Sequence, residues 1–292
     1  MPRINDIFIK TVVYLYASES DARNGLPTGG SGFLIDVTVD EASRMRQVVT
    51  NSHVVAGGGR FLRANRLDGS VHITEIPPGD WIHAPLDDVA TASFPSYLDP
   101  LLDIASLDWD ANYLNPEFGD EIRLGVGDDV LMLGRLSAND GIHRNQPVAR
   151  FGNISAMPEG TVRDGRGLDV TAFLVEMRSL SGFSGSPVFG MINPGSFRGI
   201  GVPTDLGTGH HFLLGIDTGH IRLRAPIWKS DGSGKEPALH VQEHSGVSIV
   251  VPAWTIDRFL KSDAVRELSA DSAAHFPRKA SEARGPGPLP AP

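Results

Sequence analysis

The sequence predicts an all-β chain that ends in one helix, and three observations lead to this prediction. Glycine (33) and proline (21) together make 54 of the 292 residues, well above average usage, which suits a chain with many turns. Short apolar runs alternate with turn signals such as Asp68-Gly69. A helical period appears only late, where Ile256, Phe259 and Leu260 share one face. This pattern indicates a barrel or sandwich.

The expected strands are short apolar runs, each bounded by glycine, proline or polar turn residues. In chain order they are Thr11–Tyr16, Phe33–Val37, Gln47–Thr50, Val71–Ile76, Val130–Leu133, Phe173–Met177, Val188–Met191, Phe212–Ile216 and Val247–Val251. The helix is expected over 253–268. Residues 269–292 are rich in Ala, Ser, Pro and Gly, which predicts a disordered tail.

Charge and composition exclude several classes of function. The net charge of −9 argues against a nucleic-acid partner or an anionic membrane surface. No run of about 18 apolar residues is present, so no membrane span is expected. The chain has no cysteine, which excludes a disulfide scaffold, a Cys-ligated zinc site and a cysteine nucleophile. Because 11–16 fits a first strand better than a signal peptide, we expect a cytoplasmic protein.

A glycine-flanked serine is the strongest chemical signal. Ser184 lies in the run Ser-Gly-Phe-Ser-Gly-Ser-Pro-Val, directly before an apolar strand. Acyl-transfer chemistry needs an exposed serine and backbone N–H groups that point at the developing oxyanion. The donors here would be the N–H groups of Gly182 and Ser184. Alone, this motif does not separate a nucleophile from an ordinary Gly-Ser loop.

A histidine in the run Val-Val-Thr-Asn-Ser-His-Val-Val is a candidate general base for this serine. His53 follows a β-branched run, which predicts a position at the end of a strand. A general base belongs at the edge of a rigid element, from which it can reach the serine hydroxyl. Upstream, Gly30-Ser31-Gly32 adds another turn before the run Phe-Leu-Ile.

In chain order, the Gly-Ser-Gly segment, the histidine segment and the serine segment together resemble the trypsin-like (chymotrypsin-fold) serine peptidases. The chain looks closest to their bacterial branch, related to HtrA-type proteases but without a PDZ domain. The resemblance covers roughly residues 6–260. It implies two six-stranded antiparallel β-barrels with the active site between them: 1–110 carries His53 and 111–252 carries Ser184, followed by the helix 253–268 and the tail 269–292.

The resemblance also implies an acidic residue that orients the histidine, and two positions fit. Asp88 and Asp103 each begin the pattern Asp, aliphatic residue, Ala, at 35 and 50 residues after His53. The lead-in Trp-Ile-His-Ala-Pro before Asp88 is similar to one in the bacterial enzymes and favours Asp88, which would lie in the first barrel; Asp103 remains the rival. The carboxylate would accept a hydrogen bond from His53 Nδ1 and fix the tautomer.

The specificity pocket, by the same resemblance, has walls from 178–181 and 216–220. Arg178 would favour an acidic substrate side chain and Asp217 a basic one, with Gly219 on the same wall. Either charge could instead pair with a neighbour or face solvent. The sequence therefore leaves substrate preference open.

The expected function is that of a serine endopeptidase acting on a protein or peptide substrate, with no cofactor and no metal. The segment from His240 to His244 matches the zinc motif H-x-x-E-H, which needs a helix that places both histidines on one face. Pro237 precedes this segment, Ser245-Gly246 follows it and a strand is expected directly afterwards, so no such helix is expected. Two alternatives are a catalytically silent protease-like scaffold that binds peptides, and an esterase with the same three residues.

Overall fold

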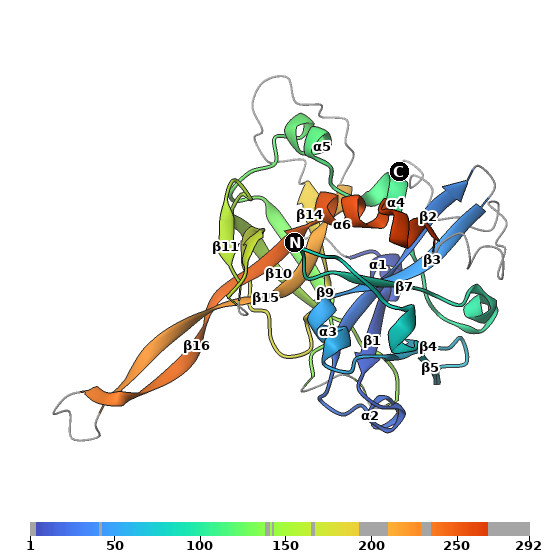
Figure 1. The fold of residues 1–292 in the computed structure, drawn as a ribbon, viewed down its shortest axis with the longest axis horizontal. Helices are drawn as coiled ribbons and strands as arrows, with labels where there is room; N and C mark the ends of the chain where they lie inside the picture. Colours follow the sequence, from blue (N-terminus) through green and yellow to red (C-terminus); the bar gives the residue numbers. More distant parts are fainter. Residues whose placement is uncertain are drawn as a thin grey trace.

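The computed structural model describes residues 4–40, 43–137, 141, 143–164, 167–192, 210–228 and 235–267. The expected tail, 269–292, lies outside the described residues. No helix in the described ranges is long and apolar enough to cross a membrane. The described chain is mostly β, as the sequence predicts, and divides into an N-terminal sheet and a C-terminal barrel (Figure 1).

The N-terminal sheet has eight strands, and its main path runs in the order β5-β4-β1-β2-β3-β7-β6. All pairs along this path are antiparallel, and β8 pairs with β2 in parallel. The strands are β1 Val12–Tyr16, β2 Gly30–Asp40, β3 Ser43–Thr50, β4 Phe61–Asn65, β5 Val71–Glu75, β6 Ile82–His83, β7 Ala90–Ser93 and β8 Leu107–Asp108.

The first of the two predicted barrels is therefore not seen as a closed barrel. The end strands β5 and β6 do not pair with each other among the described residues. They are consecutive in the chain, and Pro77 and Pro78 lie between them, where neither residue can donate a ladder hydrogen bond. β6 has only two residues, which leaves little edge for a partner.

The C-terminal barrel is closed, with six strands in the order β10-β13-β16-β15-β14-β9. Its strands are β9 Asp129–Gly134, β10 Val148–Ala156, β13 Phe173–Glu176, β14 Pro187–Ile192, β15 His210–Trp228 and β16 Lys235–Pro252. A separate two-stranded sheet pairs β11 Thr161–Arg163 with β12 Asp169–Thr171. This half confirms one of the two predicted six-stranded barrels.

Two barrel strands are much longer than their apolar runs predict. β15 and β16 leave the barrel together and extend as a two-stranded ribbon, far from the rest of the chain (Figure 1). The predicted runs, 212–216 and 247–251, are the parts of these strands that lie in the barrel.

The helices are short and lie between or after the strands. They are α1 Asp6–Lys10, α2 Glu19–Asn24, α3 Ser52–Ala56, α4 Trp109–Asn112, α5 Pro116–Glu121 and α6 Ala253–Leu260, with the 3₁₀ helices η1 Pro78–Asp80 and η2 Ser96–Leu101. The helix predicted over 253–268 begins where expected but ends at Leu260, with Lys261 as its C-cap; residues 263–267 are helical again.

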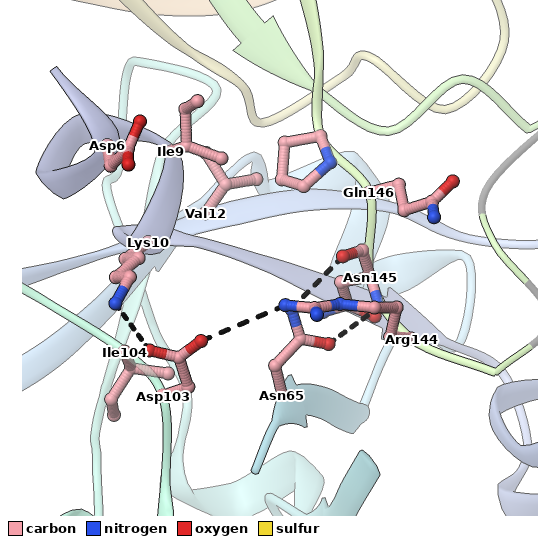
Figure 2. A pocket seen from close by; sticks show the side chains of 11 residues that line it. Asp6, Ile9, Lys10, Val12, Asn65, Asp103, Ile104, Arg144, Asn145 and Gln146 are labelled. Carbon is pink, nitrogen blue, oxygen red and sulfur yellow. Dashed lines mark hydrogen bonds and ion pairs between the residues drawn. The ribbon is translucent and has the colours of Figure 1, made fainter. Parts of the chain in front are cut away.

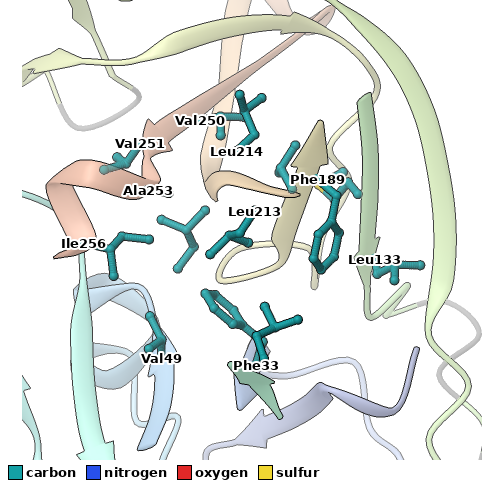
Figure 3. Close-up of a cluster of buried hydrophobic side chains, with 14 of the residues drawn as sticks. Phe33, Val49, Leu133, Phe189, Leu213, Leu214, Val250, Val251, Ala253 and Ile256 are labelled. Atoms are coloured by element: carbon teal, nitrogen blue, oxygen red, sulfur yellow. The ribbon is translucent and has the colours of Figure 1, made fainter. Parts of the chain in front are cut away.

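One hydrophobic cluster joins the two halves. Side chains from the N-terminal sheet, the barrel and α6 pack together in it (Figure 3). The members labelled there are Phe33, Val49, Leu133, Phe189, Leu213, Leu214, Val250, Val251, Ala253 and Ile256. Because this shared core is closely packed, it holds in place the segments that end where the N-terminal sheet meets the barrel.

Candidate active site

His53 lies in the first turn of α3, directly after strand β3. Asn51, which precedes this helix, is fully buried and donates from Nδ2 to the carbonyl oxygen of Asp88 at 2.8 Å. The Ser52 hydroxyl donates to the carbonyl oxygen of Val89 at 2.9 Å. These two hydrogen bonds hold the histidine segment against the segment that carries Asp88.

Asp88 contacts His53 at two points. Its Oδ2 lies 2.5 Å from Nδ1 of the imidazole, and its Oδ1 accepts the backbone N–H of His53 at 3.0 Å. The carboxylate is fully buried, whereas 36% of the histidine side chain is exposed. A carboxylate only accepts, so Nδ1 carries a proton and Nε2 is left free to act as a base toward the open side.

Asp103 lies elsewhere. It forms ion pairs with Lys10 at 2.6 Å and Arg144 at 3.8 Å, and it lines a different cavity of about 330 Å³ (Figure 2). Of the two candidate carboxylates, the structure therefore brings Asp88 to His53.

Ser184 and His53 line one cavity of about 410 Å³. Ser184 is half-buried on the loop that leads into β14. The cavity draws on both halves of the chain, and its lining residues are His53, Asp164, Ser179, Leu180, Ser181, Ser184, Thr218, Gly219, His220 and Arg222.

The loop around Ser184 turns through two glycines with positive φ. Gly182 has φ 97° and Gly185 has φ 87°. A Cβ on Gly185 would lie 2.1 Å from the carbonyl oxygen of Ser31, and one on Gly182 would lie 2.8 Å from that of Arg135. Only glycine fits this backbone without strain.

Hydrogen bonds to carbonyl oxygens fix the orientation of two peptide groups in this loop. The carbonyl oxygen of Ser181 accepts from the Ser137 N–H at 3.1 Å and from the Ser137 hydroxyl at 2.8 Å. The carbonyl oxygen of Phe183 accepts from the Ser186 N–H at 2.8 Å. In a trans peptide, N–H points opposite to C=O, so the N–H groups of Gly182 and Ser184 point away from these partners. Neither N–H donates a hydrogen bond within the described chain.

Strand β2 ties the serine loop to the N-terminal sheet through Ser31. Its hydroxyl donates to the carbonyl oxygen of Gly182 at 2.8 Å and accepts the N–H of Arg135 at 2.9 Å. Its N–H donates to the carbonyl oxygen of Ser184 at 2.8 Å, and its own carbonyl accepts from Thr50 Oγ1 at 2.7 Å. The sequence predicts only a turn at the Gly-Ser-Gly segment. Sequence reasoning did not identify Ser31 or Ser137, because each of them contacts residues that lie far away in the chain.

The expected pocket residues have different positions. Gly219 lines the cavity, whereas Arg178 is exposed and Asp217 is fully buried, both outside the cavity lining. Burial raises the pKa of Asp217 to about 8, although hydrogen bonds from the Ser179 hydroxyl at 2.7 Å and from the Gly219 N–H lower it. Burial thus favours the protonated, uncharged form of Asp217, and neither Arg178 nor Asp217 lines the cavity.

His220, which lines the cavity, stacks on His244, and sequence reasoning did not find this pair. The rings of His220 and His244 lie 3.9 Å apart at 14°. His244 Nε2 lies 2.5 Å from the carbonyl oxygen of Ser179, while its Nδ1 accepts the N–H of Gly246 at 2.8 Å, so the ring is neutral with its proton on Nε2. Burial lowers the pKa of both imidazoles.

The H-x-x-E-H segment lies on strand β16 and not on the helix that the zinc motif needs. Among the described residues, no group of three or more potential ligands could hold a metal ion.

A family model described as a trypsin-like peptidase domain matches residues 30–199, which include His53, Asp88 and Ser184. No curated protein matches the chain.

Several solved structures are similar to the chain at low identity. Deg5 is 16% identical with a TM-score of 0.48, over 87% of this chain and 88% of its own. The MamO protease domain from Magnetospirillum magneticum (apo form) is 12% identical with a TM-score of 0.49, over 88% and 98%. The HtrA-type protease AlgW, with a tripeptide, is 17% identical with a TM-score of 0.46, over 89% of this chain but only 62% of its own.

Proposed function

Because this chain belongs to the trypsin-like peptidase family, we propose that it is a serine endopeptidase that cleaves peptide bonds through an acyl-enzyme. The observation that carries the proposal is the two-point contact of buried Asp88 with His53, in a cavity that His53 shares with Ser184. Geometry and roles, rather than sequence position, identify this kind of site.

In the proposed reaction, Ser184 Oγ attacks the substrate carbonyl carbon while His53 Nε2 accepts the hydroxyl proton. Asp88 holds the Nδ1–H and stabilises the imidazolium that forms. His53 then gives the proton to the leaving amine, which departs and leaves an ester on Ser184. A water molecule, deprotonated by His53, hydrolyses this ester and frees the serine.

The developing negative oxygen would be bound by the N–H groups of Gly182 and Ser184. Both are turned away from hydrogen-bonded carbonyls, and the fixed loop requires no reorganisation during the reaction. One such donor contributes about 10²–10³-fold in kcat in a related type of site.

The test is hydrolysis of an unfolded protein, followed by mass spectrometry of the new termini. The wild type should generate internal cleavage products, and Ser184→Ala should generate none. A parallel panel of matched peptide and ester substrates separates the alternatives. Cleavage of esters without peptides would favour the esterase, and turnover of neither would favour the scaffold.

A further inference from the structure

The hairpin formed by β15 and β16 has a free strand edge that begins at the candidate active site. β14 pairs with β15 only as far as Ile216, and the backbone of Asp217 is bonded to Gly185 and Ser186 of the serine loop. From Thr218 outward, the only described strand that pairs with β15 is β16. Unpaired N–H and C=O groups on a strand edge are a template for another strand.

This edge starts inside the cavity. Thr218, Gly219, His220 and Arg222 all line it together with Ser184. Beside Gly219 the space is open, since a Cβ at that position would meet no atom within 4 Å. The ribbon then continues away from the body of the protein (Figure 1). A chain bound in the cavity therefore has a continuous edge to follow outward.

One face of the ribbon is exposed and mostly apolar, with Glu243 opposite Leu223 as its charged member. Ala225 pairs with Val241, so Leu223, two residues earlier, and Leu239, two residues before Val241, lie on the same face. Leu223, Leu239 and Val241 are 51%, 56% and 47% exposed. Nearer the barrel, Ile221 is partly covered by a small apolar cluster. An isolated two-stranded ribbon is marginally stable in water, and an exposed apolar face on it indicates an interaction surface.

The opposite face is basic. Arg222 and Arg224 are exposed there, and Arg224 pairs with Gln242. A strand added to the β15 edge would direct alternate side chains to the two faces. One set would extend the apolar surface, and the other set would lie near the arginines, where carboxylates are favoured.

We propose that residues 218–227 form a docking edge for the polypeptide substrate, which adds to β15 as an extended strand with alternating apolar and acidic side chains. This mode of recognition is β-augmentation. The proposal rests on the proposed function, because the bound chain is the one that enters the cavity. Ten strand residues span about 33 Å, so the edge accommodates about ten substrate residues, counted from the cavity outward.

The test measures binding separately from catalysis. Fluorescent peptides are titrated into the Ser184→Ala protein and followed by anisotropy. A short peptide contains only residues flanking a cleavage site, and long peptides add ten residues of alternating Leu and Glu at either end. One long peptide should bind at least about tenfold more tightly than the short one. An extension of alternating Leu and Lys should give a smaller gain.

Two variants in the Ser184→Ala background locate the effect. Leu223→Asp should remove the gain from the long peptide, whereas Leu67→Asp, at an exposed leucine in the β4–β5 turn, should preserve it. If Leu223→Asp fails to fold, Arg224→Glu tests the same edge. It should shift the preference from the Leu/Glu extension to the Leu/Lys extension.

The outcomes separate the two proposals. Equal affinity for short and long peptides, or a gain that survives Leu223→Asp, overturns the docking edge even if the wild type cleaves proteins. If the long peptide gains affinity as expected but the wild-type protein cleaves no substrate, the docking edge is supported and the proposed function is contradicted. If the wild type sediments as a dimer that Leu223→Asp dissociates, and the long peptide gains nothing, a second copy covers this face and the proposal is wrong.

Discussion

Replacing Asp88 by asparagine tests the histidine contact while keeping the size of the side chain. An asparagine keeps one oxygen that can accept the His53 N–H, now 3.0 Å from Oδ1. Its amide group, placed 2.5 Å from Nδ1, is a donor and selects the tautomer with the proton on Nε2. That tautomer cannot accept the serine proton.

The expected effect is a fall in kcat of about 10⁴, as found for this change in another triad enzyme. It corresponds to about 5.4 kcal/mol of transition-state stabilisation. The assay is the kcat of purified wild type and Asp88→Asn on one peptide substrate, with urea unfolding to compare their stability. Because the change removes a buried charge and keeps one acceptor, the free energy of unfolding should change by less than about 2 kcal/mol.

Asp103→Asn is the matched control. Asp103 pairs with partly exposed Lys10, an interaction worth up to about 1 kcal/mol, so kcat should stay within about threefold of wild type. The reasoning is refuted if Asp88→Asn keeps more than a tenth of the wild-type kcat, or if Asp103→Asn loses as much as Asp88→Asn.

Three further predictions concern the surroundings of the serine. Ser137→Ala removes the 2.8 Å hydroxyl bond that orients the oxyanion loop, and should lower kcat about tenfold with little change in KM. Gly185→Ala should lower the free energy of unfolding more than Gly69→Ala does, by at least about 1 kcal/mol in urea titrations. Both glycines have similar positive φ, but only Gly185 has an atom, the Ser31 oxygen, in the way. Asp217→Asn should change the pH dependence of stability. The raised pKa means that the folded state keeps a proton that the unfolded state releases. As the pH rises from 4 to 8, Asp217 should therefore decrease the free energy of unfolding by about 1.4 kcal/mol per pH unit, and the variant should lack this slope.

Each of these has a contrary result. A rise in KM with unchanged kcat in Ser137→Ala would place the serine in substrate binding instead of loop orientation. Equal losses in the two glycine variants would mean that backbone conformation alone, without the clash, sets the cost. Parallel stability curves for wild type and Asp217→Asn between pH 5 and pH 8 would mean that the carboxyl is ionised in the folded protein.

The local parts of the site could be predicted from sequence. Ser184 and His53 lie in short runs of sequence, and the glycines and β-branched residues in these runs indicate the local backbone conformation. The lead-in before Asp88 favoured it as the acid, but Asp103 remained a rival because both have the same local pattern. The packing of β3 against β7 is what brings Asp88 to the histidine. Ser31 shows the limit most clearly: its hydroxyl acts on Gly182, 151 residues away, and no local pattern reports such a contact.

The fold, like the site, could be predicted from sequence only in its local parts. The apolar runs located the strands that face the core, but not the outer halves of β15 and β16. The outer half of β15 alternates arginine with apolar residues, as a strand does, but it also contains Pro226, and the outer half of β16 contains Pro237. A proline argues against a strand at the centre of a sheet. Among the described strands, each strand of the ribbon pairs only with the other one, so a proline is tolerated. Local patterns also do not show whether the first sheet closes, because closure would require pairing between its end strands β5 and β6.

The most direct test of the central claim is the site of reaction with a fluorophosphonate probe. The probe transfers its phosphonyl group to an activated serine oxygen and releases fluoride. Peptide mapping by mass spectrometry should find one adduct on Ser184, absent in Ser184→Ala and strongly slowed in His53→Ala. An adduct that forms on another serine, or hydrolysis of peptides that persists in Ser184→Ala, would contradict the claim that Ser184 is the nucleophile.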